Sequence, residues 1–338
     1  MHQLNSEIQA LIAKTCKGKE HVKLTVGTYA DGEKNIQTFD ATGEIPNKNY
    51  IYEIGSITKT FTASLLAKCA HEGKLSLDDS IKKYLDGLDS GAYYPTLKRL
   101  ATHTAGYATH LPMGRFELIR IPLGLHRKWN RGIRPFSLDL EKMKMIVRRN
   151  KFKDKDYPMK YSNFGYGLLG YAVGVATGKG YWGAMDEFLS ADLGLKNSYT
   201  GPCAGKNLRG FNGRRDVGNW LWDKDLTSPA GDISSTAEDV LEYAKINMNG
   251  EKPYLALCHQ KHADVNVKRK EFAGMGLGWL LQEDNNIIWH NGGTAGFISH
   301  LAIDRAQKCA LVVLINHLVH PLEITKLGFA VFESLRKG

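Results

Sequence analysis

Two short segments near the start of the chain alternate between apolar and polar residues. They cover residues 22–30 (VKLTVGTYA) and 35–39 (NIQTF), and the turn-like sequence DGEK separates them. Period-two alternation around a short polar turn is typical of a β-hairpin. The pattern therefore predicts two early antiparallel strands.

The periodicity becomes helical after residue 56. From Ile57 to Glu72 the chain has no glycine or proline and repeats apolar residues at helical spacing, and Gly73 follows as a stop signal. Helical segments and polar loops continue to about residue 250, with clear examples at 164–178 and 236–250. The middle of the chain is expected to be mainly α-helical.

Strand patterns return after residue 270. The segments GLGWLLQ, NIIWHN, FISHLAI and CALVVLIN follow one another, with short links such as EDNN and DRAQK. Short links favour antiparallel pairing, and the early hairpin can extend the same sheet. The final segment, LEITKLGFAVFESLRK, has helical periodicity, with basic residues where they suit a helix C-terminus.

This order of elements predicts an α+β fold, in which an antiparallel sheet is flanked by helices and the chain carries a mainly helical inserted lobe. We expect one domain over residues 1–338, with an α/β lobe built from about 1–60 and 270–338. The helical lobe is expected over about 61–269. A chain of this length can bury a large core without a disulfide or a structural metal.

Composition favours an ordinary globular protein rather than a disordered chain, since 43% of the residues are apolar and 24% are charged. The longest apolar run, Cys309 to Ile315, is far shorter than the roughly 18 residues of a membrane helix. The five cysteines are widely spaced, which suits reduced thiols. The N-terminus shows no secretory signal, so we expect a cytoplasmic location by default, or an extracytoplasmic one if a leader has been removed.

The net charge of +10 is concentrated in one basic segment. Between Arg115 and Tyr157 there are 13 lysines or arginines against 5 acidic residues, an excess of +8. Such a segment can attract nucleic acid, an anionic polymer or an acidic substrate. Helical spacing in DLEKMKMIVRRN also explains several of the charges as an exposed helix face, which we favour.

Ser56 and Lys59 form a Ser-x-x-Lys sequence at the start of the first long helix, and the spacing of three puts them on one face. A serine hydroxyl needs a proton acceptor, and burial near a helix N-terminus can disfavour the ammonium form of a lysine. The N–H groups of that helix end can stabilise negative charge. Taken alone the motif is weak, because Ser80 and Lys83 also match it and an N-cap serine beside a solvated lysine looks the same.

Tyr161 and Asn163, in KYSNFGYGLLG, stand just ahead of a second helix. Two-residue spacing in an extended turn sends both side chains the same way. A tyrosine near a lysine can have its phenol pKa lowered, which suits it to proton transfer, and the asparagine can donate to a substrate carbonyl. The alternative is a segment that only caps the helix.

A third candidate is WHNGGTAGF at the end of a predicted strand. Alternation places His290 opposite Trp289, and the adjacent Gly292 and Gly293 let a ligand approach the backbone closely. The strand edge can then offer an N–H donor. The alternative is a half-exposed histidine followed by a turn.

The order of these three elements resembles that of the serine penicillin-recognising enzymes, which include class C β-lactamases, D,D-carboxypeptidases and related esterases. In that superfamily Ser-x-x-Lys, Tyr-x-Asn and a Lys- or His-x-Gly strand meet in one cleft, and this chain has SITK, YSN and HNG. The stretches LKRLATHTAGY, SPAGDISSTAEDVLEY and GLGWLL look alike too, so the resemblance runs from about Thr25 to Asn316. It also assigns Ser80 to a loop after the nucleophile helix.

The resemblance implies a role for each of the central residues. Ser56 would be the acylated nucleophile, Lys59 its proton partner and Tyr161 the general base or acid. The backbone N–H groups of Ser56 and Gly293 would form the oxyanion hole. Which residue takes the first proton stays open.

Asn163, His290 and Asn291 are the candidate substrate-binding residues. By resemblance, Asn163 would orient the substrate amide or ester. His290 stands where many relatives have lysine, which argues against an efficient class C β-lactamase and toward a peptidase or esterase. Asn291 replaces the threonine common in relatives, which weakens the expectation of binding a substrate carboxylate.

The sequence thus predicts a serine hydrolase that acts through an acyl-serine intermediate on a D-amino-acid peptide, a β-lactam or a small ester. The alternatives are a penicillin-binding or sensing module with little turnover and, from the basic segment, an anionic-polymer or nucleic-acid binder. We expect a small-molecule or peptide substrate. If residues 107–156 form a wall of the cleft, the positive charge of that segment favours an anionic substrate.

No cofactor is implied, and no nucleic-acid partner or membrane span is expected. A metal site in CHQKH is not expected, although Cys258, His259 and His262 stand close together there, because no second cluster follows at matching spacing. The oligomeric state is not predicted.

Overall fold

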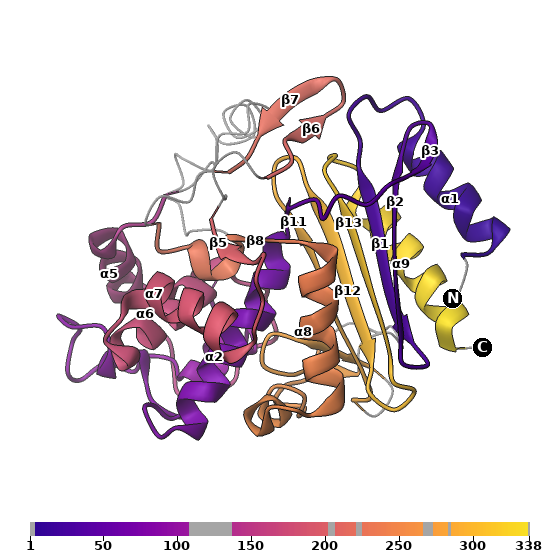
Figure 1. Cartoon of the computed structure of the whole chain (residues 1–338). Coiled ribbons are helices and arrows are strands. Elements are labelled where there is room, and N and C mark those ends of the chain that lie inside the picture. The colour runs from indigo at the N-terminus through magenta and orange to yellow at the C-terminus, as the bar shows by residue number, and fades with distance from the viewer. Residues whose placement is uncertain are drawn as a thin grey trace.

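The computed structural model describes residues 4–107, 137–201, 207–220, 225–265, 273–282 and 285–336, and its elements follow the predicted order of strands, helices, strands and helix (Figure 1). The α-helices are α1 (Ser6–Cys16), α2 (Thr58–His71), α3 (Leu97–Ala101), α5 (Leu140–Arg149), α6 (Asn163–Thr177), α7 (Gly180–Glu187), α8 (Ala237–Asn249) and α9 (Pro321–Arg336). Shorter helical turns are η1 (Gly55–Ile57), η2 (Ile81–Lys83), η3 (Phe188–Asp192), η4 (Ser228–Ala230) and η5 (Pro253–Leu257).

The strands are β1 (Leu24–Ala30), β2 (Glu33–Asp40), β3 (Gly43–Ile45), β4 (Tyr52–Glu53), β5 (Tyr199–Thr200), β6 (Gly210–Asn212), β7 (Arg215–Gly218), β8 (Ile233–Ser235), β9 (Gly274–Met275), β10 (Leu280–Gln282), β11 (Ile287–Gly293), β12 (Ile298–Asp304) and β13 (Cys309–Ile315). Eight of them form one antiparallel sheet in the order β3-β2-β1-β13-β12-β11-β10-β9. β1 and β13 join the early hairpin to the late strands, with Leu24 opposite Ile315 and Tyr29 opposite Ala310. The prediction that the hairpin extends the late sheet is confirmed.

Helices cover both faces of this sheet (Figure 1): α1 and α9 lie on one face, and α2 and α8 lie on the other. Side chains alternate between the two faces, so every residue of β12 and β13 is buried. The helix α1 was not predicted. The Asn5 side chain caps it by accepting from the Ile8 N–H at 2.9 Å, and Ile8 and Ile12 bury its apolar side against the sheet layer.

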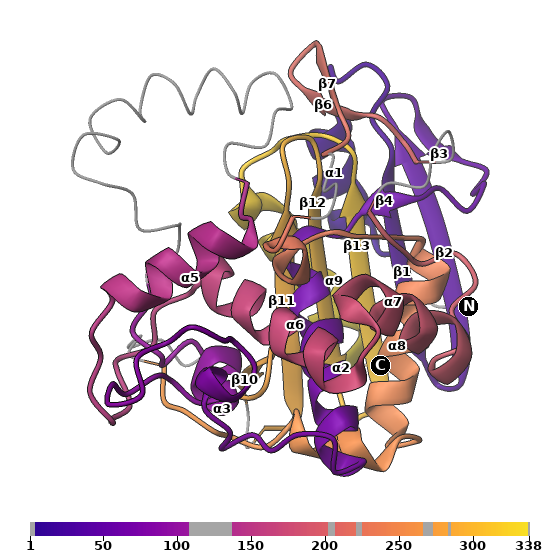
Figure 2. The same cartoon turned by 90° about the vertical axis from the view of Figure 1, so that its left-hand side faces the viewer.

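The helical lobe gathers α2, α3, α5, α6 and α7 beside the sheet (Figure 2). Helix α2 lies between the lobe and the sheet, and all of its residues from Thr58 to Ala67 are buried. Helix α8 comes from the range expected to lie in the helical lobe, yet it packs on β1 and β13. Since α2 has the sheet on one side and the lobe on the other, its first turn lies where the two meet.

In the described part of the basic segment, helix α5 carries several of the charges on an exposed face, as predicted. Helix α5 buries Met143, Ile146 and Val147, while Arg148 and Arg149 remain exposed. The rest of the segment, up to residue 136, lies outside the described residues. None of the described helices combines the length and hydropathy needed to cross a membrane.

Candidate active site

The turn that carries Ser56 contacts the end of strand β11 backbone to backbone. Gly55 has φ of 52°, and a Cβ there would lie 2.5 Å from the Gly293 nitrogen. A Cβ on Gly292 would lie 2.1 Å from the Ile54 oxygen and 2.9 Å from the Ser56 nitrogen. Gly292 therefore allows the close approach of the turn that carries Ser56, whereas the neighbouring Gly293 is exposed.

The end of β11 extends past its neighbour β10. Pairing with β10 reaches Trp289, and on the other side β12 pairs with β11 as far as Gly293. The edge from His290 to Gly293 thus begins where the β10 ladder stops. Two backbone segments that are far apart in the sequence, this strand edge and the turn that carries Ser56, therefore lie in contact.

Lys59 lies one helical turn after Ser56 and is fully buried. Its Nζ lies 3.1 Å from Ser56 Oγ, donates to the Ala230 carbonyl at 2.6 Å and sits 4.7 Å from the centre of the Tyr161 ring. Burial holds the pKa of Lys59 well below its usual range. A neutral amine at this position can accept a proton from the serine.

The side chain of Tyr161 hydrogen-bonds Ser56, so two groups contact the same serine side chain. Burial raises the pKa of Tyr161 well above its usual range, and the bond to Ser56 only partly offsets this. The expectation that a nearby lysine lowers this phenol pKa is wrong, because burial, which disfavours the phenolate, is the largest effect on the ring. Tyr161 is therefore a protonated phenol.

His290 lies on the face of β11 that carries Gly292, and its ring centre is 6.2 Å from that of Tyr161. Nδ1 lies 2.5 Å from the Asn291 carbonyl oxygen, which can only accept, so Nδ1 carries the proton and Nε2 keeps a lone pair. Burial, followed by the neighbouring Lys59, lowers the pKa of His290 to about 3. The imidazole is neutral at neutral pH and cannot act there as a cation toward a substrate carboxylate.

The other two candidate binding residues lie differently. Asn163 is the first residue of α6 and is half-exposed, beside the site residue Tyr161 in the chain. Asn291 points to the opposite face of β11, where its amide donates to Thr325 of α9 at 3.4 Å. The structure therefore does not bring the Asn291 side chain to Ser56, because strand alternation turns it away once His290 points inward.

His103 also lies at this site, although no sequence motif singled it out. It is buried, and its ring centre lies 4.6 Å from that of Tyr161. Burial and then the neighbouring Lys59 and His290 hold the pKa of His103 well below its usual range. In the sequence His103 stands in LKRLATHTAGY, and no local spacing or motif there links it to Tyr161.

The second Ser-x-x-Lys sequence has a structural role. Ser80 caps η2, accepting from the Lys82 N–H at 3.3 Å and donating to the Tyr94 carbonyl at 2.9 Å. Lys83 pairs with Asp79 at 2.9 Å. The prediction that this pair follows the first long helix, α2, is confirmed.

The CHQKH side chains bond to three separate partners. The Cys258 thiol lies against the Ala63 carbonyl at 3.5 Å, and His259 and His262 bond Asn247 at 2.9 Å and the Leu257 carbonyl at 2.8 Å. Across the described ranges, no group of three or more metal-ligating side chains is found.

Comparison with known proteins gives one family and several relatives. The family model named Beta-lactamase matches residues 10–329. Protein flp of Staphylococcus aureus (strain MW2) is 22% identical over 304 residues, which are 85% of this chain and 55% of that protein. A beta-lactamase of Providencia stuartii is 26% identical over 254 residues, which are 73% of this chain and 60% of that protein. The chain thus spans a little over half the length of these relatives.

The crystal structure of a beta-lactamase/D-alanine carboxypeptidase from Pseudomonas syringae has the same fold. It aligns with a TM-score of 0.74 at 19% identity and covers 95% of this chain and 96% of that one. The mixed helix and sheet architecture of this chain is therefore shared with that protein.

Proposed function

Because this chain belongs to the Beta-lactamase family, we propose that it is a serine hydrolase that forms an acyl-enzyme on Ser56. The observation that carries this proposal is the pair of contacts to the Ser56 side chain, from a fully buried Lys59 at 3.1 Å and from Tyr161. A nucleophile within hydrogen-bond reach of a base is the arrangement that covalent catalysis requires.

Acylation follows from the protonation states. Ser56 Oγ attacks the carbonyl carbon of an ester or amide, and its proton passes to the neutral Lys59 amine. The oxyanion of the tetrahedral intermediate accepts hydrogen bonds from the N–H groups of Ser56 and Gly293, which adjoin in the contact between the nucleophile turn and β11. The bond to the leaving group then breaks, and the leaving atom takes a proton from Tyr161. Lys59 then returns its proton to the Tyr161 oxygen.

Deacylation uses the same groups in reverse order. A water molecule attacks the acyl carbon, its proton passes to the neutral Lys59 amine, and the Ser56 Oγ–acyl bond breaks as Oγ regains a proton. The products are a carboxylic acid and the free enzyme. Asn163, at the start of α6, is suited to hold the carbonyl side of the substrate.

The strand edge favours an ester or amide that carries no carboxylate beside the scissile bond. His290 is neutral and commits Nδ1–H to the Asn291 carbonyl, and the Asn291 side chain faces α9. Neither residue supplies a positive charge on the side of Ser56. We therefore expect p-nitrophenyl acetate to be turned over faster than nitrocefin or a D-alanyl-D-alanine peptide, both of which carry a carboxylate.

A side-by-side assay with these three substrates tests the proposal, together with intact-protein mass spectrometry after exposure to a fluorophosphonate. We expect one adduct on Ser56 in the wild-type protein and neither adduct nor turnover in Ser56→Ala. Turnover retained in Ser56→Ala, or a wild-type protein that is neither labelled nor active, would overturn the proposal. Labelling without turnover would instead identify a penicillin-binding or sensing module.

A further inference from the structure

His103 accepts hydrogen bonds from both backbone N–H groups that flank Tyr161. The Lys160 N–H donates to the His103 carbonyl at 2.9 Å, and the Ser162 N–H donates to His103 Nδ1 at 3.1 Å. The imidazole also packs on the phenol ring at 4.6 Å between centres, inclined by 38°. One residue therefore fixes the backbone on each side of Tyr161 and one face of its ring.

The protonation state of His103 suits this contact. Nδ1 accepts from a backbone N–H, so the proton of the neutral ring is on Nε2. A proton on Nδ1 would point at the Ser162 N–H and break the bond. The side chain is buried and its pKa lies well below the usual range, so the acceptor persists at neutral pH.

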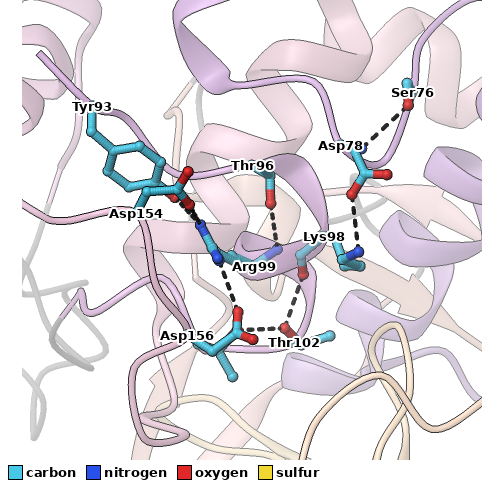
Figure 3. A network of polar contacts seen from close by, with 10 residues as sticks. Ser76, Asp78, Tyr93, Thr96, Lys98, Arg99, Thr102, Asp154 and Asp156 are labelled. Carbon is cyan, nitrogen blue, oxygen red and sulfur yellow. Dashed lines mark hydrogen bonds and ion pairs between the residues drawn. The ribbon is translucent and has the colours of Figure 1, made fainter.

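A second set of contacts, nearer the surface, ties the same segment to α3 (Figure 3). Arg99 donates from Nε to Asp156 at 2.8 Å and from Nη1 to Asp154 at 2.6 Å. The two aspartate side chains are 76% and 77% exposed, so water and salt weaken these ion pairs. Arg99 thus provides a natural control, because it holds the segment without touching Tyr161.

We propose that His103 is a positioning residue, which holds the Tyr161 hydroxyl against Ser56 through the Ser162 N–H and exchanges no proton itself. Only the expected effect of His103 on the catalytic rate depends on the proposed function. A displacement of the reacting groups by about 1 Å lowers rates by about 100-fold, so a loosened Tyr161 backbone has a measurable effect.

The test compares His103→Asn with His103→Leu, two side chains of similar shape of which only asparagine offers an acceptor near the position of Nδ1. His103 has φ of 61°, a region that asparagine tolerates better than leucine, so unfolding free energy is measured for both. With p-nitrophenyl acetate we expect kcat per folded molecule to fall about 10- to 100-fold in His103→Leu, with a smaller change in KM. His103→Asn should stay within about threefold of wild type and keep its pH profile.

Two controls separate a positioning role from a general loosening of the segment. Arg99→Met should loosen the segment with little effect on kcat, and crystal structures of both His103 variants should show the Tyr161 hydroxyl displaced from Ser56 in the leucine variant alone. Equal kcat in the two His103 variants, or an altered pH profile in His103→Asn, would overturn the inference. If the wild-type protein never labels on Ser56, the proposed function fails, while the Tyr161 positions in the crystals still test His103.

Discussion

Lys59 Nζ lies 3.1 Å from Ser56 Oγ, in a side chain with no exposed surface. Replacing the amine should therefore remove proton acceptance without opening the site to water. We predict that Lys59→Met lowers the rate of fluorophosphonate labelling by about 100- to 10,000-fold. Lys59→Arg should be no better, because a guanidinium stays protonated. Rapid labelling in either variant would exclude Lys59 as the acceptor.

The raised pKa of Tyr161 predicts a phenol that donates rather than a phenolate that accepts. In Tyr161→Phe the bond to Ser56 is lost while the ring remains, so kcat/KM should fall about 100- to 10,000-fold with an unchanged unfolding midpoint. The wild-type pH profile between pH 8 and 10 should show no inflection that Tyr161→Phe removes. Such an inflection would indicate that the phenolate takes part.

The two glycines at the end of β11 should respond differently to alanine. A Cβ on Gly292 meets backbone atoms at 2.1 and 2.9 Å, whereas a Cβ on Gly293 meets the Ile298 side chain at 3.2 Å. We predict that Gly292→Ala abolishes labelling of Ser56 or unfolds the protein, and that Gly293→Ala keeps the fold and most of the labelling. Circular dichroism and labelling rates distinguish these results, and equal behaviour of the two variants contradicts the backbone contact.

Alternation along β11 predicts unequal roles for His290 and Asn291. Asn291→Ala removes a 3.4 Å bond to Thr325 on the far face, so KM for p-nitrophenyl acetate should change by less than about twofold. His290→Ala opens the face of β11 near Tyr161, and it should lower kcat/KM clearly more than Asn291→Ala does. A larger effect at Asn291 than at His290 would place the asparagine at the substrate.

Asp232 makes stability depend on pH. Burial raises its pKa to about 8. Between about pH 4 and 8 the folded state thus keeps a proton that the unfolded state has released, and stability falls as pH rises, by up to about 1.4 kcal/mol per unit. Asp232→Asn should flatten this slope in urea unfolding at pH 6 and pH 8. Identical slopes would show that Asp232 ionises normally.

The parts of the fold and site that could be predicted depend on local spacing. The sheet followed from period-two segments with short links, and the Ser56 and Lys59 contact from a separation of three on one helix. His103 could not be found in this way, because its bond to Ser162 joins two loops that only the folded chain brings together. The phenol pKa was mispredicted for a related reason, since the burial that raises it comes from segments far from Tyr161 in the sequence.

The contact between Gly55 and Gly293 has a consequence for biosynthesis. The turn that carries Ser56 leaves the ribosome long before the strand β11 that it contacts, and β1 must wait for β13 before both of its edges are bonded. A nascent chain therefore carries Ser56 without its backbone neighbours until β11 has been made. Such distant pairings also slow folding and leave strand edges exposed in the interval, when they can pair with other chains.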